Sequence, residues 1–251
     1  MRSGSSAGTE RSTYAFNSHS KRRRDRSGGL IRLAALAKEF GEVWVVAPDG
    51  QRSAASHAIS LHSHVDVYPH DFPIEGVRAF SCSGTPADCV RVGAVSLMPS
   101  KPDIVLSGIN NGYNVATDIQ YSGTAGAAFE GAFHGCLSIA ISEEAKSCHE
   151  VADRYLPEIL AELVEQRLGY GQIFNVNIPA CPLSECRGIL RDRAVSHGMF
   201  YRDRYKKTAD LPNGGMRLVV DGQYNEDCEP DTDFSAVVGK YISIGIVNNH
   251  N

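Results

Sequence analysis

The residues best suited to chemistry lie within residues 102–131, PDIVLSGINNGYNVATDIQYSGTAGAAFEG. The apolar run 104–106 predicts a buried strand, and a loop of small and polar residues follows it. Ser122, Gly123 and Thr124 then precede the run 125–133, which predicts a helix with a hydroxyl cap. A strand that ends beside a helix N-terminus suits an anion or a metal-bound phosphate. An Asn/Gly-rich turn between two core elements is the alternative interpretation.

A second polar loop follows another predicted strand. Residues 49–57, DGQRSAASH, come directly after the apolar run 43–47. Ligands of doubly wound sheets bind at the carboxyl ends of the strands, so we expect both loops at one edge of the sheet.

Helical and strand patterns alternate through the first 180 residues. Apolar spacing predicts helices over 30–40, 85–98, 125–133 and 151–168, and strands over 43–47, 59–67, 77–82, 104–106, 137–142 and 173–178. This alternation predicts an α/β fold with a mostly parallel sheet and helices on both faces. Residues 181–251 are more irregular, with strands expected near 216–220 and 241–247 and a helix over 234–239. We expect a core over 29–180 with an appendage, 181–251, integral to the same domain.

Composition indicates an ordinary globular protein. The chain has 251 residues, 42% hydrophobic and 22% charged, and a formal net charge of -4, which predicts no general affinity for nucleic acid. No apolar run is long enough to cross a membrane. Seven cysteines without metal-type pairs favour free thiols in a reducing compartment, so we expect a cytoplasmic protein.

Residues 1–28 differ from the rest, because they carry seven basic residues against two acidic ones and show neither helical nor strand periodicity. We interpret them as an atypical, solvated basic tail; the run 21–26 as a nucleic-acid or nuclear-import patch is the weaker alternative. The tail has no apolar segment of a secretory signal. It also offers no strand before the helix at 30–40, although a parallel βαβ unit requires one.

Several blocks resemble the SurE-type survival-protein nucleotidases. They are APDGQRSAASHAISL, SGTPADCV, PDIVLSGINNGYN, YSGTAGAAFEG and DTDFSAVVGKYISI, and they occur in order over about residues 29–247. The resemblance implies a Rossmann-like fold and a phosphatase, dependent on Mg²⁺ or Mn²⁺, that releases phosphate from nucleoside 5'- and 3'-monophosphates. It also implies a homodimer or homotetramer with contacts through the C-terminal region.

The resemblance assigns roles to individual positions. Ser53 and Asn110 match metal ligands of the family, while Asn114 and the Ser122-Gly123-Thr124 block would hold the substrate phosphate. Neutral oxygens suit a hard cation when carboxylates supply the charge. Without the resemblance, Ser53 and Asn110 are turn residues and Ser122 is an ordinary cap.

The N-terminus departs from the family, whose opening strand ends in Asn-Asp-Asp-Gly. Residues 21–26 are KRRRDR instead, so the metal-binding aspartate pair is absent and the catalytic residues are unknown. Ser53 and Asn110 bring no negative charge, and a cation held by them alone is weakly bound. Residues 21–27 can be encoded as AAA CGA CGA CGG GAT CGA TCC; read one base later, this string gives Asn-Asp-Asp-Gly-Ile-Asp. We hypothesise that residues 1 to about 28 are an out-of-frame N-terminus, which sequencing the gene would test.

Two functions follow from this pattern. The first is a metal-dependent nucleotidase, although we expect the chain as it stands to lack full activity. The second is a catalytically dead relative that binds nucleotides or interacts through its basic tail. Phosphate release abolished by EDTA would indicate the first. Salt-sensitive binding lost on deletion of residues 1–28, with no turnover, would indicate the second.

Overall fold

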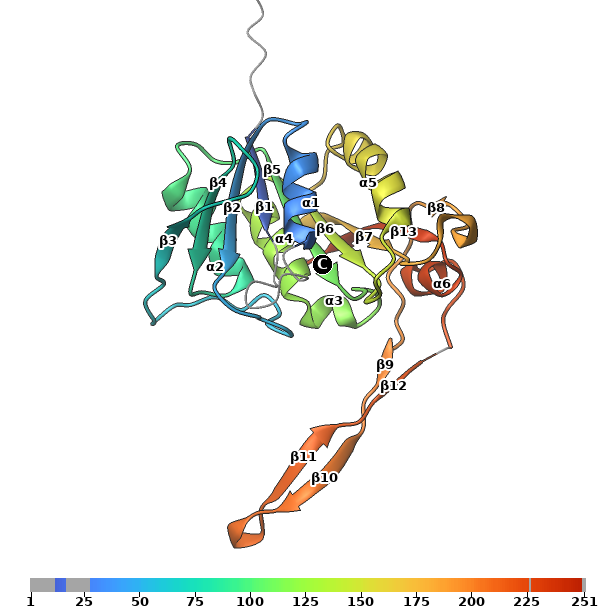
Figure 1. The fold of residues 1–251 in the computed structure, drawn as a ribbon. Coiled ribbons are helices and arrows are strands. Elements are labelled where there is room, and N and C mark those ends of the chain that lie inside the picture. The colour runs from blue at the N-terminus through green and yellow to red at the C-terminus, as the bar shows by residue number, and fades with distance from the viewer. Residues whose placement is uncertain (1–11, 17–27, 226, 250–251) are drawn as a thin grey trace, which may run out of the picture.

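A nine-stranded sheet forms the centre of the computed structural model, which describes residues 12–16, 28–225 and 227–249 (Figure 1). The strand order is β3-β4-β2-β1-β5-β6-β7-β13-β8. The strands from β4 to β7 in that order pair in parallel, whereas β3 and β13 join their neighbours β4 and β7 antiparallel. The predicted mostly parallel sheet is therefore confirmed. The nine strands are β1 (Ser12–Phe16), β2 (Glu42–Pro48), β3 (Val67–His70), β4 (Arg78–Cys82), β5 (Ile104–Asn111), β6 (Leu137–Glu143), β7 (Gln172–Ile178), β8 (Ile189–Leu190) and β13 (Ile242–Asn248).

The expectation that residues 1–28 contain no strand is wrong, because β1 lies within them. Its backbone pairs with β2 on one side and β5 on the other, and so fills the middle of the sheet. Thr, Tyr and Phe favour extended structure, but a run of five residues is too short to establish a period. The missing half of the first βα unit is thus present, while residues 17–27, including the KRRRDR run, lie outside the described residues.

Helices cover both faces of this sheet, as predicted. Helices α1 (Gly28–Ala37) and α5 (Glu150–Leu163) pack on one face, with α2 (Pro86–Val92) and α4 (Gly123–Phe133) on the other (Figure 1). Side chains of strand β2 pack against the helices on both faces of the sheet. Val45 belongs to the core cluster beneath α1 and α5, and its neighbour Val46 belongs to the cluster beneath α2 and α4. Alternate side chains of a strand point to opposite faces, so a doubly covered strand is apolar throughout.

Two segments differ from their predicted form. Residues 59–66 are not a strand. Within them, the Ser60 amide and hydroxyl donate to the Asp88 carboxylate, at 2.9 and 2.7 Å, and not to a neighbouring strand. The helix predicted over 85–98 is α2 followed by a π-helical segment, η1 (Gly93–Leu97). Its predicted start is confirmed, since the Thr85 hydroxyl accepts from the Asp88 amide at 3.1 Å.

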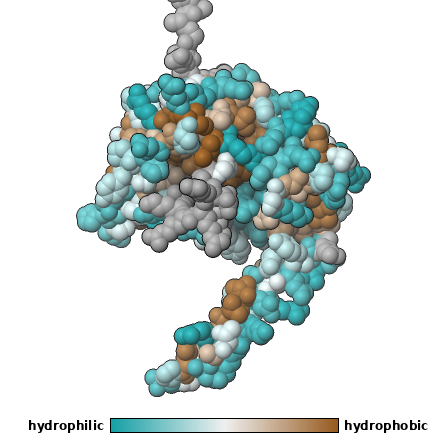
Figure 2. Space-filling view, viewed as in Figure 1, coloured by the Kyte–Doolittle hydropathy of each residue, from teal (hydrophilic) through white to brown (hydrophobic). Residues whose placement is uncertain are grey.

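The C-terminal third carries a hairpin that projects from the body (Figure 1). Strands β10 (Tyr205–Asp210) and β11 (Met216–Val220) pair antiparallel, and β9 (Tyr201–Arg202) pairs with β12 (Gln223–Tyr224) at the base. Figure 2 shows apolar groups exposed along this arm, and its exposed large apolar side chains include Tyr205, Met216, Leu218, Val219 and Val220. Helix α6 (Asp233–Val238) and β13 then return the chain to the body. Short segments complete the described fold: α3 (Asp118–Tyr121), η2 (Leu183–Glu185) and η3 (Pro212–Gly214).

All seven cysteines lie in the described part of the chain and are free thiols, as predicted. Within the described ranges, no helix combines the length and apolar character needed to span a bilayer.

Candidate active site

The candidate site lies at the carboxyl end of β5. This strand is next to β1, where the order of strands in the sheet changes direction. From β1 the chain moves outward to β2 and β4, and it later returns to add β5, β6 and β7 on the other side. Such a switch point leaves a crevice outside the carboxyl ends of the strands. Asn110 occupies this position, one residue before β5 ends.

A bulge in β5 determines how Asn110 is presented. The register with β6 shifts between Ser107 and Asn110. Gly108, within the bulge, has φ +150°, and a Cβ atom there would lie 2.4 Å from the Ile141 carbonyl oxygen, so only glycine fits. Bulges turn the strand and redirect the following side chains. The half-buried Asn110 amide donates to the Gly112 carbonyl oxygen at 2.8 Å.

Helix α4 begins against this strand, as the sequence predicted. The Ser122 hydroxyl accepts from the Ala125 amide at 3.1 Å, which confirms the cap. The Ser107 hydroxyl on β5 donates to the Thr124 carbonyl oxygen at 2.8 Å, and Thr124 is 1% exposed. The fold therefore places the Ser122-Gly123-Thr124 block in direct contact with β5 at Ser107.

The loop that carries Ser53 packs on α3, the short helix directly before α4, and on α4 itself, where a Cβ atom on Gly126 would lie 2.3 Å from the Ser56 carbonyl oxygen. The Ser56 amide donates to the Tyr121 carbonyl oxygen at 3.0 Å, and the Ser56 hydroxyl donates to the Gln120 carbonyl oxygen at 2.6 Å. Ser53 itself is exposed, and its hydroxyl accepts from the Gln51 amide group at 2.8 Å. Both predicted polar loops thus meet at α4, although no single pocket holds Ser53 together with Asn110 among the described residues.

A buried carboxylate that the sequence did not reveal anchors this loop. Glu130 on α4 is 4% exposed and contacts His57 at 2.8 Å, Arg91 at 3.1 Å and His134 at 3.2 Å. Burial alone would raise the pKa of Glu130, but the hydrogen bond from His57 and the charge of Arg91 outweigh it and lower that pKa. His57, four residues after Ser53, is therefore tied to the body of α4.

Asn114 hydrogen-bonds to residues inside the protein, whereas a phosphate-binding side chain would face the ligand. It is 5% exposed, and its side-chain amide donates to the Ser142 hydroxyl at 2.6 Å. Its backbone amide donates to Asn177 Oδ1 at 2.8 Å, and its carbonyl oxygen accepts from Asn175 at 2.8 Å. These contacts hold the loop after Asn110 in place, so phosphate binding by Asn114 stays a prediction.

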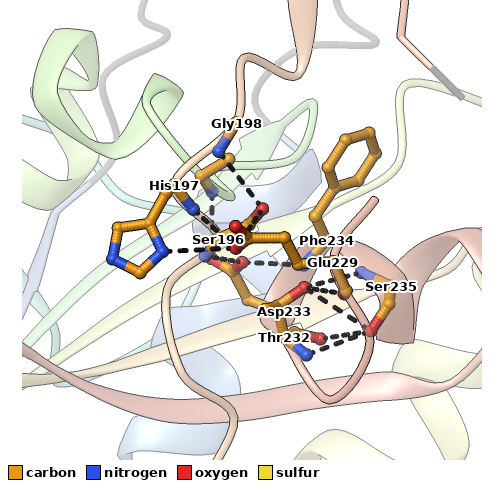
Figure 3. A network of polar contacts seen from close by, with 9 residues as sticks. Ser196, His197, Gly198, Glu229, Thr232, Asp233, Phe234 and Ser235 are labelled. Atoms are coloured by element: carbon orange, nitrogen blue, oxygen red, sulfur yellow. Dashed lines mark hydrogen bonds and ion pairs between the residues drawn. The ribbon is translucent and has the colours of Figure 1, made fainter. Parts of the chain in front are cut away.

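A buried aspartate at the start of α6, Asp233, holds the loop after β5 at Ala116. Figure 3 shows the polar contacts around Asp233. Asp233 is 3% exposed and accepts from the amides of Ala116 at 3.0 Å, Ser196 at 2.9 Å and Phe234 at 2.7 Å. Burial raises its pKa, although the three amides oppose the shift. Asp233 thereby joins the appendage to the loop that leaves β5.

The pocket beside Asn110 has a volume of about 500 Å³ and contains both cations and a carboxylate. Glu143, 4% exposed on β6, accepts from Arg32 at 3.2 Å and from His149 at 2.9 Å. Its second carboxylate oxygen, Oε1, is buried and has no hydrogen-bond partner in the described part of the chain. Because Arg32 neutralises the charge of Glu143, this pocket has no net negative charge from that carboxylate with which to bind a cation.

The described residues do not fit a complete divalent-metal site. Within the described ranges, no group of three or more His, Cys, Asp or Glu side chains is arranged to hold a metal ion. Ser53 and Asn110 offer neutral oxygens only, and hard cations require carboxylate charge for tight binding. The sequence outside these ranges carries a lone Asp25 among arginines where the resemblance calls for an aspartate pair.

Comparison with known proteins identifies the family. The model of the family described as survival protein SurE matches residues 25–199. The chain belongs to the SurE family. Among curated relatives, the protein named 5'-nucleotidase SurE from Clostridium botulinum is 37% identical over 220 residues, covering 86% of each chain. The protein of the same name from Synechococcus sp. is 39% identical over 225 residues, covering 87% of this chain and 85% of the relative.

A solved SurE protein shares the fold. The crystal structure of the SurE protein from Aquifex aeolicus superposes with a TM-score of 0.76 at 30% identity, covering 94% of this chain and 93% of that one. The Rossmann-like SurE architecture expected from the resemblance is thus confirmed. Glu130 and Asp233 lie within the quoted blocks and Glu143 outside them, and the resemblance assigned none of the three a role.

Proposed function

We propose that this chain is a SurE-type nucleotidase that hydrolyses nucleoside 5'- and 3'-monophosphates to a nucleoside and phosphate. One observation carries the proposal: in a chain of the SurE family, strand β5 and the loop that carries Ser53 both contact the first turn of α4, at Thr124 and Gly126, beside the switch point of the sheet. Relatives at 36–39% identity are named 5'-nucleotidase SurE. In a phosphoric monoester hydrolase, this edge would bind the phosphate.

The chain's own residues would bind and orient the phosphate. Helix α4 has 11 residues, and its N-terminus, at Ser122, Gly123 and Thr124, presents backbone amides and a positive dipole end to an anion. The Ser107 contact and the Glu130 cluster fix that helix and the Ser53 loop relative to β5. Mg²⁺ or Mn²⁺ is the proposed cofactor, with Ser53 and Asn110 as two of its ligands.

The missing aspartate pair limits this activity. Because the described residues supply no charged donor set for the cation, the proposed activity of the chain with its KRRRDR run is low. Replacing residues 21–24 by Asn-Asp-Asp-Gly restores the pair and should raise phosphate release from AMP with Mn²⁺. Equal release by the two chains would contradict this explanation. No release by either chain, with nucleotide binding retained, would favour the alternative of a catalytically dead nucleotide-binding protein.

We also propose that the protein is a cytoplasmic homodimer or homotetramer. The arm of β10 and β11 exposes Tyr205, Met216 and Val220 at 55% or more, and a second copy would cover them. Light scattering after size exclusion should show a monomer when residues 205–220 are replaced by a short Gly/Ser linker. An unchanged mass would contradict the role of the arm.

A further inference from the structure

A second pocket adjoins the one beside Asn110. It has a volume of about 800 Å³, within the range of small-molecule sites. The two pockets share Asn111, Ala145 and Lys146 in their lining. Tyr113, which lines the larger pocket, follows Asn110 by three residues, so the two Cα atoms are at most about 10 Å apart. A ligand held at the end of β5 could therefore extend into this pocket.

Aromatic rings form one side of this larger pocket. Phe200 packs edge-to-face with Tyr113, Tyr224 and Phe234, with ring centroids 6.2, 5.2 and 5.1 Å apart. Tyr224 also packs against Tyr201 at 4.9 Å. Phe234 is fully buried, whereas Tyr224 is 65% exposed and so has ring surface available to a ligand. The Asn225 amide donates to the Phe200 carbonyl oxygen at 3.0 Å, which connects the two segments that carry these rings.

Polar groups complete the lining of this pocket. Asp118 and Glu144 lie in it, and burial together with the nearby Glu144 carboxylate raises the pKa of the Tyr113 hydroxyl. Burial raises the pKa of Asp118, and the nearby Asp203 adds to the shift. Carboxylates accept hydrogen bonds from amino and hydroxyl groups, which a nucleoside carries on its base and its ribose. Flat rings with acceptors at their edge therefore match a nucleoside better than an aliphatic ligand.

We infer that the pocket formed by Tyr113, Phe200 and Tyr224 binds the purine nucleoside part of the substrate, with the base stacked on Tyr224. The identity of the ligand rests on the proposed function; the pocket and its rings do not. Stacking on an aromatic ring tolerates different bases, so adenosine and guanosine should both bind, and the larger purines should bind more tightly than pyrimidines.

The test is calorimetric titration of the full chain with adenosine, which needs neither a cation nor turnover. Tyr224→Ala should weaken adenosine binding at least about fivefold, the low end of measured base–aromatic stacking. Tyr68→Ala is the matched control, because Tyr68 is 64% exposed on β3 and does not line this pocket. Ribose 5-phosphate, which lacks a base, should bind both variants and the parent chain equally.

The outcomes separate this inference from the proposed function. Adenosine binding that is absent, or equal in the parent chain and Tyr224→Ala, would overturn the inference even if AMP is hydrolysed. Binding that depends on Tyr224 would support it even if no chain releases phosphate. A change of oligomer mass in Tyr224→Ala with unchanged adenosine binding would mean that a second copy covers the ring instead, and would overturn the inference as well.

Discussion

Replacing Glu130 by Gln tests whether the buried carboxylate holds the Ser53 loop on α4. The Glu130 side chain is 6% exposed and contacts one arginine and two histidines. Glutamine keeps the shape and removes the charge, which leaves Arg91 without its partner. Breaking a buried ion pair costs about 3–5 kcal/mol, and the 47% exposure of Arg91 favours the low end. A loss of about 3 kcal/mol lowers the Tm of a chain of this size by about 6–12 °C.

Thermal unfolding at pH 7, followed by circular dichroism, measures this loss. Glu158→Gln on α5 is the control, because Glu158 is 62% exposed and pairs with Arg154 one helical turn away. Such a surface pair contributes up to about 0.5 kcal/mol, so the control should change Tm by about 2 °C at most. A Tm for Glu130→Gln within that margin would refute the proposed anchor.

The pH dependence supplies a second check on Glu130. Its pKa in the folded protein is lowered from the usual 4.5, so its stabilising contribution is complete above about pH 4.5. That contribution is lost as pH falls through the lower, folded pKa. The difference in Tm between the parent chain and Glu130→Gln should therefore shrink below about pH 4.5. A difference that stays constant to pH 3 would show that the charge is not its source.

Two further substitutions test the geometry around β5. Gly108→Ala should lower the free energy of unfolding by about 3 kcal/mol in a denaturant titration, since its Cβ would meet the Ile141 carbonyl oxygen. Gly28→Ala, whose Cβ would have no atom of the described residues within 4 Å, should be neutral in the same titration. Asp233→Asn should cost about 1–3 kcal/mol, because its new amide group must face a backbone donor, and hydrogen exchange at Ala116 and Ser196 should accelerate. Unchanged hydrogen exchange at both amides would argue against the role of Asp233 in joining the appendage to the loop after β5.

Local signals in the sequence predicted much of the fold and part of the site. The hydroxyl cap at Ser122 formed as expected, and the helix predicted from residue 85 begins with a cap at Thr85; each cap depends on a residue three positions away. Strand β1 was missed because five residues establish no period and because its stability comes from pairing with β2 and β5. Pairing across such distances is set by the whole sheet, which no local window of sequence contains.

The buried polar contacts were missed for the same reason. Glu130 is a single acidic residue on an otherwise apolar helix, and its partner His57 lies 73 positions earlier in the chain. Asn175 and Asn177 gave a weak signal, because two amides on the same side of an otherwise apolar strand need internal partners. Asn114 is that partner, but nothing in the sequence connected it with them.

Phosphate release from AMP in the presence of Mn²⁺ tests the central claim most directly. Three chains are compared: the parent chain, a restored chain with Lys21→Asn, Arg22→Asp, Arg23→Asp and Arg24→Gly, and the restored chain that also carries Asn110→Ala. We predict strong, EDTA-sensitive release by the restored chain only, and a loss of at least about 100-fold on adding Asn110→Ala. Equal release by all three chains would contradict the account, because neither the aspartate pair nor Asn110 would then contribute to the reaction.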